Sequence, residues 1–108
     1  MTYSDAERWY RVIKASSLEI LRKEFFKYCA EYAQVRTQWS FLTKEERLER
    51  NQSRTLKHNA LISSANALSR NMVQNEEDAS WRAELGTDRR RIGDFACYVA
   101  CFIGLENS

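Results

Sequence analysis

The sequence contains no proline and only three glycines in 108 residues. Tight turns and β-hairpins depend on these two residues, because proline presets φ and glycine adopts positive φ without strain. Their scarcity argues strongly against a strand-rich fold. A chain of this length forms one modest core. We therefore predict an all-α fold with one domain, residues 1–108, built as a bundle of about four helices with the C-terminal helix central.

Histidine occurs once and cysteine three times. A structural zinc site needs four ligands, and Cys97 and Cys101, four residues apart, have no further ligands at a suitable spacing. These two cysteines and Cys29 lie on apolar stretches, where a thiol is usually inert. The sequence also has no glycine-rich phosphate loop and no nucleophile spaced to meet a base. We predict that the protein is not an enzyme and binds neither a metal nor a cofactor.

The charges nearly balance, with 17 basic and 15 acidic side chains and a net charge of +2. Any electrostatic function must therefore be local. The first ten residues carry neither the basic nor the apolar region of a secretory signal. An odd number of cysteines does not form a disulfide framework, and no apolar run reaches the roughly 20 residues that span a bilayer. We expect a cytoplasmic protein that does not bind a membrane.

Residues 87–105, TDRRRIGDFACYVACFIGL, form the most apolar stretch. Thr87 is the expected cap, and Gly93 predicts close approach by a neighbouring backbone. Three- and four-residue steps place one apolar set on a single side of this helix: Ile92, Phe95, Ala96, Val99, Phe102 and Ile103. The opposite side is also largely apolar and carries the candidate interface: Cys97, Tyr98, Cys101 and Leu105. A chain this short has few other helices to cover a second apolar face, so we predict a protein partner, as a homodimer.

Four further helices are expected from caps and periodicity. A capping box at Ser4 predicts a helix from Asp5, and a second box, Ser16-Ser17-Leu18-Glu19, favours a break over one continuous helix. Apolar residues at alternating steps of three and four predict a helix over 18–39 with one core side: Leu18, Leu21, Phe25, Tyr28, Tyr32, Val35 and Trp39. Its aromatics are of the kind on which unpaired bases stack, but core packing is the interpretation we favour. A capping box at Thr43 predicts a helix to about Val73, and an acidic loop follows over 74–78. Asp78 then caps a short helix, 81–85, closed by a glycine.

The helix after Thr43 has a polar first half on its expected core side. If the last helix packs against this half, Asp94 faces it, and together they define a candidate polar cluster: Asn51, Arg54, His58, Asn59 and Asp94. The cluster suits a small anionic ligand, with His58 titrating near neutral pH. A hydrogen-bonded structural network, or a helix end that leaves the core for solvent, is the interpretation we favour.

Basic residues recur along the same helix and at the start of the last one. They form a candidate nucleic-acid-binding stripe: Arg47, Arg50, Arg54, Lys57, Arg89, Arg90 and Arg91. Such a stripe can neutralise phosphates. Acidic residues nearby in sequence, including Glu46 four residues before Arg50, favour local pairing instead.

Residues 81–96, WRAELGTDRRRIGDFA, resemble a segment of short bacterial proteins of unknown function, some of them linked to phage or mobile elements. The resemblance covers the C-terminal third and implies an all-helical fold without an activity. It points to a polar and aromatic skeleton: Trp81, Arg82, Asp88, Arg91 and Asp94. Taken together, the sequence predicts a small non-enzymatic interaction or regulatory protein that acts through a helical surface, with nucleic-acid binding as the alternative.

Overall fold

A computed structural model describes residues 1–107. These residues contain no strand and form five helices, which confirms the predicted all-α fold with a single domain. The helices are α1 (Tyr3–Lys14), α2 (Glu19–Trp39), α3 (Lys44–Gln74), α4 (Ser80–Leu85) and α5 (Arg89–Glu106).

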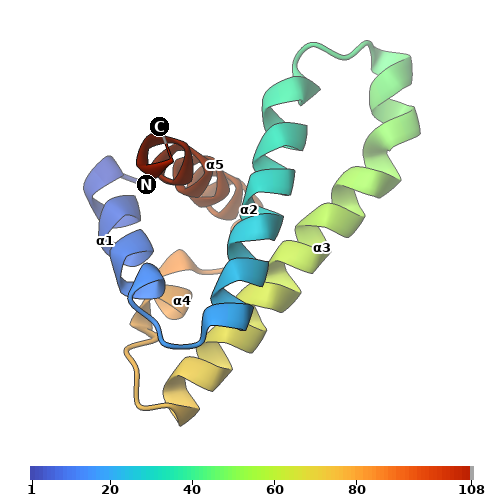
Figure 1. Ribbon diagram of the computed structural model, residues 1–108. Coiled ribbons are helices and arrows are strands. Elements are labelled where there is room, and N and C mark those ends of the chain that lie inside the picture. Colours follow the sequence, from blue (N-terminus) through green and yellow to red (C-terminus); the bar gives the residue numbers. More distant parts are fainter. Residues whose placement is uncertain (108) are drawn as a thin grey trace.

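Helices α2 and α3 form a long antiparallel hairpin, and α5 lies between α1 and α2 (Figure 1). Helix α5 packs against α1, α2 and α4, so the prediction of a central C-terminal helix is confirmed. Helix α3 packs mainly against α2 and, more weakly, α4. At a rise of 1.5 Å per residue α3 is about 46 Å long, close to the 47 Å length of the whole molecule. The closed end of the hairpin therefore projects beyond α5.

The hydrophobic core includes a set of aromatic rings drawn from four helices. Phe25 of α2 lies at its centre, with ring centroids 5.6 Å from Trp81 and 6.4 Å from Phe95. Phe95 in turn meets Trp9 edge-on at 5.6 Å. Each of these side chains is at most 2% exposed. Truncating one such buried ring to alanine costs about 3–5 kcal/mol, so this cluster is a principal source of stability.

Three predicted helix starts are wrong by one or two residues. Helix α4 begins at Ser80 with Ala79 at the N-cap position, not at Trp81 after a cap at Asp78. The other two are the starts of α1 and α5. Helix α1 is capped by Thr2 rather than Ser4, because Thr2 Oγ1 accepts a 3.1 Å bond from the backbone N–H three residues on. Helix α5 is capped by Asp88 rather than Thr87, and Asp88 Oδ1 accepts from the N–H two residues on at 2.8 Å. In both places two adjacent or near-adjacent residues are good caps, and local sequence does not rank them. The capping box at Thr43 is confirmed.

The predicted break between α1 and α2 is confirmed, but the capping box expected there does not form. Ser16 Oγ donates to the Glu77 carboxylate at 2.6 Å, and Ser17 donates to it from both N and Oγ at 2.9 Å. Glu19 instead pairs with Lys23 at 2.6 Å. A residue 60 positions away therefore fixes this turn, which a local motif does not reveal.

Candidate functional site

The α2–α3 hairpin and the first turn of α5 border an open cavity of about 400 Å³, which we name the arginine cleft. Helix α2 supplies three lining residues at steps of four and three, which is why they share one side of the helix. Helix α3 supplies one and α5 two. The lining residues are Tyr32, Arg36, Trp39, Arg54, Arg89 and Arg90, and none is acidic.

A smaller cavity of about 170 Å³, the side cavity, adjoins the cleft. Its basic lining residues are Arg50, Arg54 and Lys57, and it too has no acidic lining residue. Trp39 and Arg54 line both cavities, so this pair forms the partition between them. The Arg54 guanidinium lies 4.1 Å from the centroid of the Trp39 ring, a close cation–π contact.

Most of the cationic side chains that line the two cavities have no carboxylate partner. Within residues 1–107 none of Arg50, Arg54, Lys57, Arg89 and Arg90 forms an ion pair. Arg54 Nη2 donates to a side-chain amide oxygen one turn earlier, at 3.1 Å, but its Nε is buried and has no partner. Buried donors are normally satisfied, and leaving one unmade costs about 1–3 kcal/mol. Within residues 1–107 this buried donor is therefore left without an acceptor.

His58 borders this region without lining the cleft. Its ring meets Tyr32 edge-on with centroids 5.4 Å apart, and its Nε2 is buried without a partner. Burial, and next the positive charge of Arg89, lower the pKa of His58, while a hydrogen bond that the imidazole donates to the Asn59 side chain acts in the opposite direction. Both dominant effects favour the neutral imidazole.

Asp94 does not join the predicted polar cluster. Its Oδ1 lies 2.6 Å from Arg36 Nη2, in a partly exposed ion pair between α5 and α2. The prediction assumed that α5 packs on the polar half of α3, whereas α5 packs on α2. Gly93 also has a different neighbour from the one predicted. A Cβ at Gly93 would lie 2.7 Å from Arg36 Nη1, so a side chain approaches it and not a backbone.

The predicted basic stripe divides into two groups. The first group lines one or both cavities: Arg50, Arg54, Lys57, Arg89 and Arg90. Arg47 instead donates from Nε to the Trp39 carbonyl at 3.0 Å and so closes the hairpin. Arg91 donates from Nε to the Glu84 carbonyl at 3.2 Å, and its guanidinium lies 5.4 Å from the Trp9 ring. The side chains of these two arginines therefore join elements of the fold and line neither cavity.

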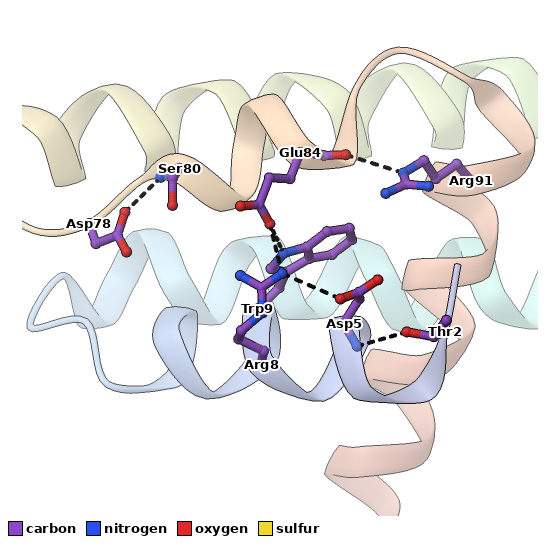
Figure 2. Close-up of polar contacts among 8 residues, drawn as sticks. All are labelled: Thr2, Asp5, Arg8, Trp9, Asp78, Ser80, Glu84 and Arg91. Atoms are coloured by element: carbon purple, nitrogen blue, oxygen red, sulfur yellow. Dashed lines mark hydrogen bonds and ion pairs between the residues drawn. The ribbon is translucent and has the colours of Figure 1, made fainter.

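Glu84 ties the short helix α4 to α1 and α5 (Figure 2). Its carboxylate accepts from Trp9 Nε1 and, at 3.1 Å, from Arg8, while its carbonyl accepts from Arg91. At the other end of α4, Asp78 accepts from the Ser80 N–H at 2.9 Å, which satisfies one free donor of the helix start. This network fixes the entry into α5 and with it the first turn that borders the cleft.

The other residues of the 81–96 segment also make structural contacts. Trp81 is 1% exposed in the core. Arg82 joins α4 to α3, since its Nε donates to Asn66 Oδ1 at 2.8 Å and its Nη1 donates to the Gly86 carbonyl at 2.8 Å. Burial lowers the pKa of Arg82. Arg82, Arg91 and Asp94 of this segment therefore contact α3, α1 and α2, respectively.

The candidate interface on α5 is partly covered by the chain itself. Tyr98 is half-buried and meets Tyr3 of α1 with centroids 6.0 Å apart. Cys97 is also half-buried, whereas Cys101 is exposed and Leu105 is 68% exposed. The uncovered part of this face is therefore its C-terminal half.

Three residues of the cleft were absent from the sequence-based candidates: Tyr32, Arg36 and Trp39. The two aromatics were assigned to the core stripe of α2, and Arg36 was not considered. Their spacing carries the signal, because steps of four and three place Arg36 on the same helix side as both rings. The spacing does not show which element faces that side of α2, because this depends on where α5 packs.

Comparisons with protein-family models, with curated proteins and with solved structures found no match. Residues 1–107 bring together no group of three or more histidine, cysteine, aspartate or glutamate side chains suited to a metal ion. In the same residues no helix is both long and apolar enough to pass through a bilayer. The chemistry of the cleft is therefore the feature that points to a function.

Proposed function

We propose that this chain is a non-enzymatic nucleic-acid-binding protein whose arginine cleft and side cavity hold phosphate groups. The observation that carries the proposal is the gathering of five cationic side chains without ion pairs around two adjoining cavities with no acidic lining residue. The net charge of the whole chain is only +2, so this gathering is local rather than a consequence of composition.

Arginine is well suited to this role. Its planar guanidinium presents a fork of donors that matches phosphate oxygens two at a time, and it remains charged at any physiological pH. Arg36, Arg54, Arg89 and Arg90 bring four such groups to the cleft from three helices. Arg54 is half-buried, where a charge-assisted hydrogen bond is screened less by salt than at an exposed position.

The proposal is tested by fluorescence anisotropy with labelled oligonucleotides, single-stranded and duplex, at low and rising salt. Binding must weaken as salt rises, because each neutralised phosphate releases counterions. For about four contacts to a single strand, the logarithm of the association constant falls with a slope of about −3 against the logarithm of salt concentration. A folded protein that binds neither form at low salt overturns the proposal.

Variants locate the binding. Replacing Arg89 and Arg90 together by alanine removes two exposed cations of the cleft and should reduce the salt slope by about 1–2. The matched control is Arg70→Ala, which removes an exposed arginine from the other half of α3. An equal loss of affinity per charge removed in the two proteins would mean that net charge, and not the cleft, governs affinity.

A second candidate is the predicted homodimer through the outer face of α5. It is favoured by the exposure of Leu105 at 68% and of Tyr3 at 54%, two large apolar side chains. Sedimentation equilibrium across the micromolar range tests it, with Leu105→Lys as the variant that should weaken a dimer. A monomer throughout that range argues against self-association and leaves the nucleic-acid proposal untouched.

A further inference from the structure

We infer that the nucleic acid bound here is single-stranded, with one unpaired base inside the arginine cleft beside Trp39 and a neighbouring phosphate at the side cavity. This inference rests on the proposed function and goes further, because it names the form of nucleic acid and the group that enters each cavity.

The first argument is the shape of the surface. The cations without ion pairs surround recesses of about 400 and 170 Å³ and do not lie along a single exposed ridge. Arg54 and Lys57 are only partly exposed. A duplex presents its phosphates on a convex surface and keeps its bases stacked inside, so its backbone reaches exposed cations but its bases do not enter a recess. An unpaired nucleotide brings both a flat base and a phosphate.

The second argument is the chemistry of the walls. Unpaired bases stack on aromatic rings and on arginine guanidinium planes. The arginine cleft contains both kinds of surface, because Trp39 and Arg54 are lining residues. The Arg54 guanidinium covers one face of the Trp39 ring, 4.1 Å from its centroid, so a base would stack on the outer side of this pair. Sites that only neutralise phosphate have no need of aromatic walls. The size is also suitable, since small-molecule sites begin at about 300 Å³.

The third argument is the relation between the two cavities. They share Trp39 and Arg54 and are separated by them. The side cavity is less than half the size of the cleft, and Arg50 and Lys57 add two cations to it. This size and charge suit a phosphate rather than a base. A strand that places its base in the cleft thus passes its backbone towards Arg50 and Lys57.

The test compares three ligands on the unaltered protein: a single-stranded oligodeoxynucleotide, the same sequence paired as a duplex, and an abasic strand of equal length. Since stacking on one aromatic group commonly strengthens binding by a factor of ten or more, the single strand should bind about tenfold tighter than the abasic strand. Equal affinity of the single and abasic strands overturns the inference, and so does a duplex that binds as tightly as the single strand. In both cases the proposed function stands. Failure of all three ligands to bind overturns the proposed function itself.

Tryptophan fluorescence gives a second readout. Trp9 and Trp81 are at most 2% exposed, so a base entering the cleft reaches only Trp39, which is half-buried. The single strand should quench the emission, and the abasic strand should not. In Trp39→Phe, which keeps an aromatic ring at this position, the quenching should disappear while salt-dependent binding persists. Unchanged quenching in this variant contradicts the placement of the base.

Discussion

Arg36 of α2 lies directly over Gly93 of α5, with its Nη1 2.7 Å from the point where a Cβ on Gly93 would stand. The same guanidinium pairs with Asp94 at 2.6 Å and is part of the lining of the arginine cleft. The missing side chain of Gly93 therefore leaves room for an arginine that joins two helices and borders the site. A glycine inside a helix, which costs about 1 kcal/mol relative to alanine, has a specific reason here.

Gly93→Ala should separate stability from binding. Alanine favours the helix by about 1 kcal/mol, but its Cβ displaces the flexible end of Arg36 and weakens a partly exposed ion pair worth about 0–1 kcal/mol. The free energy of unfolding should therefore change by less than about 1 kcal/mol, while oligonucleotide affinity falls several-fold. Urea denaturation and fluorescence anisotropy measure the two effects. A loss of several kcal/mol would mean that rigid backbone, and not a side chain, opposes the new methyl group.

Neighbouring arginines at the start of α5 should behave differently on substitution. Arg91→Ala removes a 3.2 Å bond to the Glu84 carbonyl and a contact with the Trp9 ring, so it should lower the free energy of unfolding by about 1–2 kcal/mol. Arg90→Ala should leave stability within about 0.5 kcal/mol of the original and weaken nucleic-acid binding. Denaturation and anisotropy on both variants give the comparison. Identical behaviour of the two variants would contradict the division of the basic stripe.

The helices and their order could be predicted from sequence because their signals are local. The 3.6-residue periodicity over 18–39, the capping box at Thr43 and the break at Ser16-Ser17 each involve residues within a few positions. The exact caps of α1 and α5 were missed because good capping residues stand next to or near one another there. Local patterns thus give the elements more reliably than their first residues.

The site could be predicted only in part. Arg50, Arg54, Lys57, Arg89 and Arg90 were recognised as basic residues on helix faces. Their common environment depends on how α5 docks against the hairpin, which is a relation between segments far apart in sequence. The prediction placed Asp94 against the polar half of α3, where it would have neutralised the site. Because α5 packs on α2, Asp94 pairs with Arg36 and the cations on α3 remain without carboxylate partners.

Glu76→Gly should stabilise the fold. Glu76 has a φ of 59° at the end of α3, in the left-handed region that only glycine adopts without cost. The Glu77 N–H donates to the Met72 carbonyl at 2.8 Å and the Glu76 N–H to the Val73 carbonyl at 3.1 Å, which is the Schellman arrangement that usually ends in glycine. The free energy of unfolding should rise by about 1 kcal/mol. Glu76→Ala is the control, since alanine at the same φ should give no comparable gain in urea denaturation.

His58 should make stability depend on pH between its folded and unfolded pKa values. Burial and the charge of Arg89 lower the pKa of His58 in the folded state, whereas the unfolded chain keeps a value of about 6.5. Between these values the unfolded state binds more protons, so the free energy of unfolding falls as pH drops below about 6.5 and levels off below the folded pKa. Urea denaturation between about pH 7.5 and 5.5 should show this loss in the original protein and a smaller one in His58→Gln.

Protonation of His58 should also make oligonucleotide affinity depend on pH. A phosphate bound beside Arg89 offsets the charge that disfavours protonation of His58, so binding should raise the pKa of His58. By linkage, oligonucleotide affinity should then strengthen as pH falls through that pKa, although the free protein becomes less stable over the same range. The two trends have opposite signs, which separates them from a general loss of folded protein. Anisotropy titrations at several pH values should give this increase in the original protein and a flat profile in His58→Gln; a parallel increase in both would assign the effect to another group.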